Sequence, residues 1–217
     1  DSTQNQFKIC TKQAIADCIL VSAFAALYDA FPNTKFTIEI PNNFDLHTLD
    51  YDLFIGLNIE ASYGLAIDND NLEMATIFYD SFSVVMDRHH PLASRKLLDI
   101  SDLLDYQLIF HTYDSVSNDY YNELIKPSSY NKKLDIILRS NNARVVTNLL
   151  LTSETVLCTN SIIATNDYII NNELVVIPLK NFKYHCFCLY KPDSPHKSLI
   201  FQLIKILQDT RLKLLSK

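Results

Sequence analysis

Short apolar segments alternate with helical segments along this chain, and the alternation restricts the folds open to it. The sequence predicts strands over 7–10, 36–40 and 52–56, and a long helix over about 13–31 between the first two. A strand–helix–strand order within roughly 50 residues is typical of α/β proteins with a parallel sheet. Thr11 is expected to cap this helix, and Pro32 to end it.

A second alternation begins after a turn at residues 89–94. The predicted strands are 74–79, 82–86, 107–110, 134–138, 155–158, 174–177 and 184–190, and the predicted helices are 119–126, 143–151, 161–170 and 195–215. No linker rich in Pro or Gly divides the chain. Two lobes would therefore exchange strands directly, without a tether between them.

Composition excludes several classes of protein. Of the 217 residues, 48% are hydrophobic and 20% charged, so the chain can bury a core and is not disordered. With 2 glycines it contains neither GxGxxG nor GxxxxGK, which excludes nucleotide-binding enzymes of those types. A net charge of −6 argues against binding duplex DNA by itself.

The long helix is apolar on more than one side. Ile15 and Ile19 lie on one side, and Leu20 and Phe24 on another, so a core and a further layer or subunit must cover it. No apolar run is expected to approach the roughly 18 residues that span a bilayer, and no signal-peptide pattern opens the chain. The 5 cysteines are odd in number and irregularly spaced, which favours a reducing cytoplasm.

Several motifs resemble, in order, the effector-binding region of LysR-type transcriptional regulators. The first is the long helix that ends at Phe31-Pro32. The segment Leu49-Asp-Tyr-Asp-Leu-Phe-Ile-Gly56 resembles the family's DLAIG strand. His90-Pro-Leu-Ala93 resembles its HPLA turn, and Val176-Ile-Pro-Leu179 resembles its LPL strand. The resemblance implies an α/β fold of two Rossmann-like lobes joined by two crossover strands, as in type 2 periplasmic binding proteins. Lobe I would hold 1–79 plus 184–217, and lobe II 80–183.

The resemblance also implies a function. The chain would be the cytoplasmic ligand-sensing and dimerisation domain of a regulator, and DNA would be contacted only by an N-terminal winged helix-turn-helix domain absent from this chain. It would form a homodimer through helices 13–31 and 143–151, and the full-length protein a homodimer or homotetramer. We expect no enzymatic activity, cofactor, metal or membrane contact. A solute-binding protein of a transport system is the alternative.

The family's effector lies between the lobes, at strand ends and helix N-termini, where free backbone N–H groups favour polar or anionic ligands. The matching positions are Thr11, Lys12, Gln13, Pro41, Asn42 and Asn43 in lobe I, and His111, Thr112, Tyr113 and Ser117 in lobe II. Lys12 is the only cation among them. Ordinary capping and turn chemistry is the other interpretation, since Thr and Asn are frequent in turns.

Other side chains carry weaker signals. Ser153-Glu-Thr155 replaces the family's G-x-G, and Asn160 stands where a proline is usual. His89 and His90 are adjacent in a turn and lack the i, i+4 spacing of a metal site. Cys186 and Cys188 would share one face of a strand, which favours buried thiols over a redox switch. No GxSxG or other catalytic signature occurs.

Overall fold

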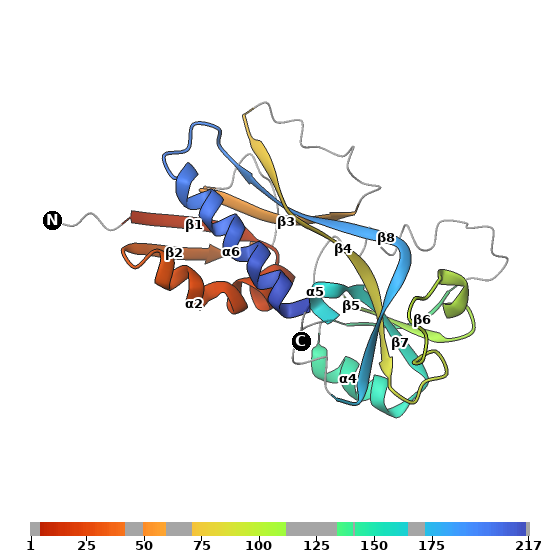
Figure 1. Ribbon diagram of the computed structural model, residues 1–217. Helices are drawn as coiled ribbons and strands as arrows, with labels where there is room; N and C mark the ends of the chain where they lie inside the picture. The colour runs from red at the N-terminus through yellow and green to blue at the C-terminus, as the bar shows by residue number, and fades with distance from the viewer. Residues whose placement is uncertain are drawn as a thin grey trace. The chain divides into compact units, whose positions relative to one another are not determined.

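The computed structural model describes residues 5–41, 50–59, 71–111, 134–140, 142–164 and 172–215. The chain divides into two compact units: unit 1 is Asp1–Tyr79 with His185–Lys217, and unit 2 is Asp80–Tyr184. Eight strands are hydrogen-bonded in the order β2-β1-β3-β8-β4-β7-β5-β6, which confirms the α/β class (Figure 1). β4 (Glu73–Asp87) and β8 (Leu174–Tyr190) each run through both units.

β4 and β8 correct the predicted strands. Residues 74–79 and 82–86 belong to one strand of 15 residues, and residues 174–177 and 184–190 to one of 17. The polar residues Asp80, Ser81 and Lys183 interrupt the apolar pattern but not the strands. Asn181, with φ 65°, is the one described non-glycine residue in the left-handed region.

Unit 1 is built on three parallel strands. β1 (Asn5–Thr11) lies between β2 (Thr34–Glu39) and β3 (Leu53–Ile59). The chain leaves β1 for β2 on one side and returns to β3 on the other, so the strand order reverses between β1 and β3. In open α/β sheets this reversal marks the edge at which ligands bind, outside the carboxyl ends of the strands.

The predicted helix 13–31 is present but is not a uniform α-helix. It consists of α1 (Gln13–Ile15), the π-helical turn η1 (Ala16–Leu20) and α2 (Val21–Ala30). In the π-helical turn, the Val21 N–H donates to the Ala16 carbonyl. Single π-helical turns inside α-helices are frequent at functional sites.

This helix also overturns the expectation that no apolar run approaches the length of a membrane span. Gln13–Ala30 has 18 residues and a mean hydropathy of 1.4, long and apolar enough by length and composition. The reason is that the helix is apolar on several sides, and a core helix passes the same test. Within unit 1 the helix buries Ile15, Ile19 and Leu27 and packs on α6 (Lys197–Leu215).

Unit 2 repeats the parallel arrangement. β5 (Gln107–His111) lies between β6 (Asp135–Ser140) and β7 (Thr155–Asn160), and β4 runs antiparallel to β7. The remaining helices described here are η3 (Ile100–Leu103), α4 (Ala143–Thr152) and α5 (Ser161–Ala164). The predicted helix 119–126 and residues 165–170 of the next one lie outside the described residues.

The end of α4 accounts for the missing G-x-G. Ser153 leaves the helix with φ −151°, an extended conformation that any residue adopts. Its Oγ donates to the Leu149 carbonyl at 2.6 Å and lies 3.0 Å from Oγ1 of Thr155. A hydroxyl therefore satisfies one of the orphan carbonyls that a glycine turn satisfies elsewhere.

Candidate functional site

In unit 1, candidate site residues lie where β1 and β3 end. Thr11 is fully buried, and its Oγ1 donates to the Ile55 carbonyl at 3.0 Å. The expectation that Thr11 caps the helix is therefore wrong, because its side chain bonds across the sheet. Lys12 is the N-cap residue, and it makes no side-chain cap. The amino end of the long helix is thus left without a side-chain acceptor among the described residues.

Lys12 places a positive charge at this helix terminus. Its carbonyl accepts from the N–H groups of Ile15 and Ala16, both at 3.1 Å, and its side chain is only 8% exposed. Lysines are rarely buried to this extent. The amino end of a helix already carries the positive end of the backbone dipole, so this position strongly favours a nearby anion.

Of the other predicted lobe I residues, the structure describes Gln13 and Pro41. Gln13 follows Lys12, and its Nε2 donates to Asp17 Oδ2 at 2.8 Å, so this amide is held within the helix. Pro41 is half-buried just after β2. Asn42 and Asn43 lie outside the described residues. The structure therefore places Thr11, Lys12 and Gln13 together at the end of β1.

Less of the predicted lobe II set falls on described residues. His111 is the last residue of β5, and only its backbone is described. Thr112, Tyr113 and Ser117 lie outside the described residues.

The carboxyl end of β7 carries polar residues that sequence reasoning missed. Thr159, Asn160 and Ser161 are all buried there, and Ser161 Oγ lies 2.7 Å from the buried Tyr184 hydroxyl. Thr159 is 3% exposed, and its Oγ1 has no hydrogen-bond partner within the described part of the chain. Because buried hydroxyls are normally satisfied, this one is a candidate ligand contact. In the sequence, the only sign of these residues was the polar run Thr159-Asn160-Ser161 between an expected strand and an expected helix.

The cysteines are not part of this site. All five are buried, which confirms the interpretation of Cys186 and Cys188 as buried thiols. Burial raises the pKa of Cys10 to about 11 and the pKa values of Cys158 and Cys188 to about 12. The thiolate is the reactive form, so such thiols are poor nucleophiles. The described residues contain no group of three or more His, Cys, Asp or Glu side chains that could hold a metal ion.

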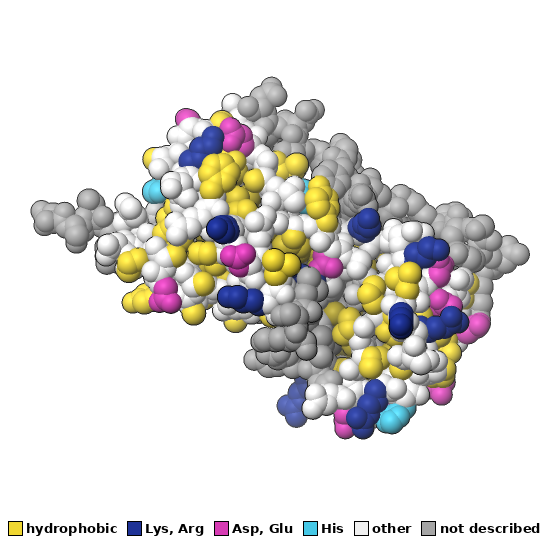
Figure 2. Space-filling model, in the orientation of Figure 1, with side chains coloured by type: hydrophobic (Ala, Val, Ile, Leu, Met, Phe, Trp, Pro, Cys, Tyr) yellow, Lys and Arg dark blue, Asp and Glu magenta, His cyan; other side chains and the backbone are white. Residues whose placement is uncertain are grey.

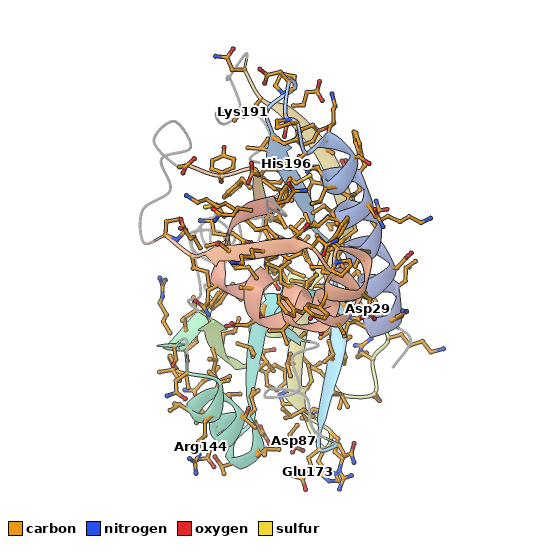
Figure 3. All side chains as sticks on the ribbon, turned by 90° about the vertical axis from the view of Figure 1, so that its left-hand side faces the viewer. Asp29, Asp87, Arg144, Glu173, Lys191 and His196 are labelled. Carbon is orange, nitrogen blue, oxygen red and sulfur yellow. The ribbon has the colours of Figure 1, made fainter. Side chains whose placement is uncertain are left out.

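Each unit also exposes apolar side chains on a helix. On α2, Val21, Phe24 and Tyr28 are exposed at helical spacing, and on α4 Val145 is exposed beside a surface hollow lined by Arg144, Thr147, Asn148 and Leu151. Figure 3 shows Asp29 near the end of α2 and Arg144 at the start of α4, on the outside of the protein. Within the described residues, neither Asp29 nor Arg144 forms an ion pair.

Comparison with known proteins identifies relatives over nearly the whole chain. The family model of the LysR substrate binding domain matches residues 1–211. A comparison with curated protein sequences gives no significant match.

Solved structures of similar fold come from the same group of regulators. The reduced OxyR regulatory domain from Pseudomonas aeruginosa is 15% identical, with a TM-score of 0.72 over 97% of this chain and 98% of that one. The regulatory domain of MetR, a LysR family regulator from N. meningitidis, is 13% identical, with a TM-score of 0.69 over 96% and 94%. A full-length OxyR variant from Pseudomonas aeruginosa gives 14% identity and a TM-score of 0.73, over 97% of this chain and 68% of that one. These matches confirm the fold of type 2 periplasmic binding proteins.

Proposed function

Since the chain belongs to the LysR substrate binding domain family, we propose that it senses a small effector on behalf of a LysR-type transcriptional regulator. The observation that carries this proposal is the family match over residues 1–211, which leaves almost none of the chain to another function. The similar structures are regulatory domains of transcriptional regulators, so the transport alternative is not favoured. DNA would be contacted by a winged helix-turn-helix domain of the full-length regulator.

The effector of this proposal is an anion, with a carboxylate as the simplest case. Lys12 supports this choice, because it is a buried lysine at a helix terminus that no described side chain caps. The carboxyl ends of β1 and β3, beside it, are the edge of the sheet at which α/β proteins bind ligands. Ligand binding there would shift a population between pre-existing arrangements of the protein.

We propose separately that the end of β7, within unit 2, binds a hydroxyl or carbonyl group of a ligand. The support is the group of buried polar side chains at the end of β7, where Thr159 Oγ1 is left without a partner among described residues. A ligand atom that bonds to it would remove the cost of an unsatisfied buried hydroxyl, about 1–3 kcal/mol. The Thr11 hydroxyl already donates to the Ile55 carbonyl, so it could contact a ligand only as an acceptor.

A thermal-shift screen of small carboxylates tests the effector site. A ligand that binds only the folded chain raises its stability by mass action, by about 2.7 kcal/mol at 100 times Kd. For a confirmed ligand, Lys12→Gln should reduce the ligand-induced rise in Tm, whatever it does to Tm without ligand. Lys35→Gln, at an exposed lysine of β2, is the matched control and should leave the rise intact. An unchanged rise in Lys12→Gln contradicts the placement.

We also propose that the chain forms a dimer through helices 13–31 and 143–151. The family forms oligomers, and these helices expose Val21, Phe24 and Val145. Packed antiparallel, the end of α2 from one copy would meet the start of α4 from the other, which brings Asp29 to Arg144. Each of these charges has the wrong sign for its own helix dipole, and an intermolecular ion pair would offset that cost.

Sedimentation equilibrium of charge-swapped variants tests the dimer. Asp29→Arg and Arg144→Asp should each weaken association, because each sets two like charges side by side. The double variant restores opposite charges and should recover most of the loss. A double variant as weak as the sum of the two single variants would remove this pairing from the proposal.

The remaining expectations follow the family. The family serves transcriptional regulation, and no catalytic step is proposed for this chain. A cytoplasmic location is proposed, because buried thiols persist most readily in a reducing compartment.

A further inference from the structure

The exposed face of α6 carries an ordered set of side chains. Its exposed residues form one stripe along the helix: Ser198, Phe201, Gln202, Lys205, Asp209, Leu212 and Lys213. Phe201 is 50% exposed and Leu212 64%, and both are large apolar side chains. Figure 2 shows hydrophobic, basic and acidic side chains together on the surface where α6 lies in Figure 1.

Four members of the stripe, Phe201, Lys205, Asp209 and Leu212, form a self-complementary order when the helix is reversed. From the N-terminus of α6 to its C-terminus, these side chains are apolar (Phe201), basic (Lys205), acidic (Asp209) and apolar (Leu212). The midpoint of the outer pair is at position 206.5 and that of the inner pair at 207, so the two centres differ by half a residue, about 0.8 Å along the helix. We infer that α6 packs antiparallel on α6 of a second copy, with Phe201 against the partner's Leu212 and Lys205 paired with the partner's Asp209.

Helix geometry supports this register. At 1.5 Å per residue, Phe201 lies about 9 Å before position 207 and Leu212 about 8 Å after it, so the two meet across a twofold axis. At 3.6 residues per turn, Phe201 and Leu212 also lie on the same edge of the stripe, about 20° apart around the helix. A twofold axis between antiparallel helices brings side chains on the same edge together.

Among the described residues, neither Lys205 nor Asp209 forms an ion pair. They are four residues apart, but with the cation nearer the helix N-terminus, which is the weaker orientation of such a pair. An antiparallel partner supplies two pairs, Lys205 with the partner's Asp209 and its symmetry mate.

The helix is held firmly under this stripe. Lys197 Nζ lies 3.1 Å from Glu73, and the Phe201 ring packs edge-on against Tyr190 with centroids 5.9 Å apart. Further along, Gln208 Nε2 donates to the Ile77 carbonyl at 2.9 Å. A surface that is already ordered loses little entropy on binding.

One pair of helices makes a small interface. It falls below the roughly 1,000 Å² of a stable independent interface, so association through α6 alone is weak. The stripe consists of α6 residues alone and includes none of the α2 or α4 residues named above, and the inference does not depend on any effector.

The test is sedimentation equilibrium of the 217-residue chain over a wide concentration range, in a background of Asp29→Arg to weaken the other proposed contact. We expect reversible self-association that Phe201→Glu weakens by at least ~10-fold. Leu97→Glu, at an exposed leucine of unit 2, is the matched control and should leave it unchanged. Circular dichroism confirms that each variant is folded.

The charge pair gives a second readout that loss of folding cannot imitate. Lys205→Asp and Asp209→Lys should each weaken association, and the double swap should restore it to near the parent value. Self-association that Phe201→Glu leaves unchanged overturns the inference, as does a double swap that fails to recover. If α6 instead binds a different protein, the chain's self-association will be indifferent to all these variants, which also overturns it.

Discussion

Replacing Gly56 by alanine tests whether two aromatic rings require glycine in the middle of β3. A Cβ atom at this position would lie 2.7 Å from Cε1 of Phe54 and 2.9 Å from Cζ of Phe187, well inside van der Waals contact. Both rings belong to a buried cluster with Cys10 and Leu189. The predicted strand 52–56 ended at Gly56, but β3 continues to Ile59, so the rings and not a turn explain the glycine.

Two effects of opposite sign decide the outcome. Alanine restricts the unfolded chain, which stabilises the protein by about 0.4–1 kcal/mol where the native backbone accepts it. The backbone does accept it, since Gly56 does not have a positive φ. Overpacking a filled core costs about 1–3 kcal/mol. The steric cost is larger, so we expect Gly56→Ala to lower the free energy of unfolding by about 1–2 kcal/mol.

Urea unfolding followed by circular dichroism measures this loss, as a lower midpoint at an unchanged slope. The variant Phe54→Leu makes room beside the new methyl group. Combined with Gly56→Ala it should cost less than the sum of the two single changes, because the two positions share one contact. The steric argument would be refuted if the Gly56→Ala variant were at least as stable as the parent. It would also be refuted if the double variant lost as much stability as the two single variants together.

Three further predictions concern stability and thiol chemistry. Burial lowers the pKa values of His90 and His185 below 6.5, so the folded chain binds fewer protons than the unfolded chain. The free energy of unfolding should therefore be nearly constant above pH 6.5 and should decline below it. Urea unfolding at pH 7.5 and at pH 5.5 measures this difference, and equal free energies at the two pH values would contradict the prediction. Asn142 Oδ1 accepts from the Val145 N–H at 3.1 Å and caps α4, so Asn142→Ala should cost about 0.5–2 kcal/mol in the same assay, while Asn142→Asp should cost much less. The buried thiols, with the pKa of Cys158 raised to about 12, should react with a disulfide reagent only as fast as the chain opens, and rapid reaction in native buffer would count against their burial.

Sequence patterns predicted the strands of the fold well, because an interior strand is apolar along its whole length. Leu108-Ile-Phe110 is an example, buried at every residue in β5 between two parallel neighbours. The patterns failed where a strand crosses from one unit to the other. At Asp80-Ser81 in β4, polar residues interrupt the apolar run, yet the backbone remains extended.

The candidate site was less accessible from the sequence. A threonine before a helix has the composition of a cap, and nothing local shows that its hydroxyl bonds to Ile55, 44 residues further on. The polar run Thr159-Asn160-Ser161 has the composition of a surface turn, and only the tertiary structure buries it. Position along the chain was informative for Lys12, because a residue between a strand and a helix lies at the carboxyl edge of a parallel sheet.

The π-helical turn Ala16–Leu20 has a consequence for the orientation of α2. A π-helical turn accommodates one extra residue, and each residue rotates an α-helix by about 100°. After the turn, α2 buries Ala23 and Leu27 on one side and exposes Val21, Phe24 and Tyr28 on another. Deleting a single residue here would leave the helix continuous yet turn Val21, Phe24 and Tyr28 by about 100° toward a different neighbour. One residue of chain length thus decides which side chains this helix offers to a second subunit.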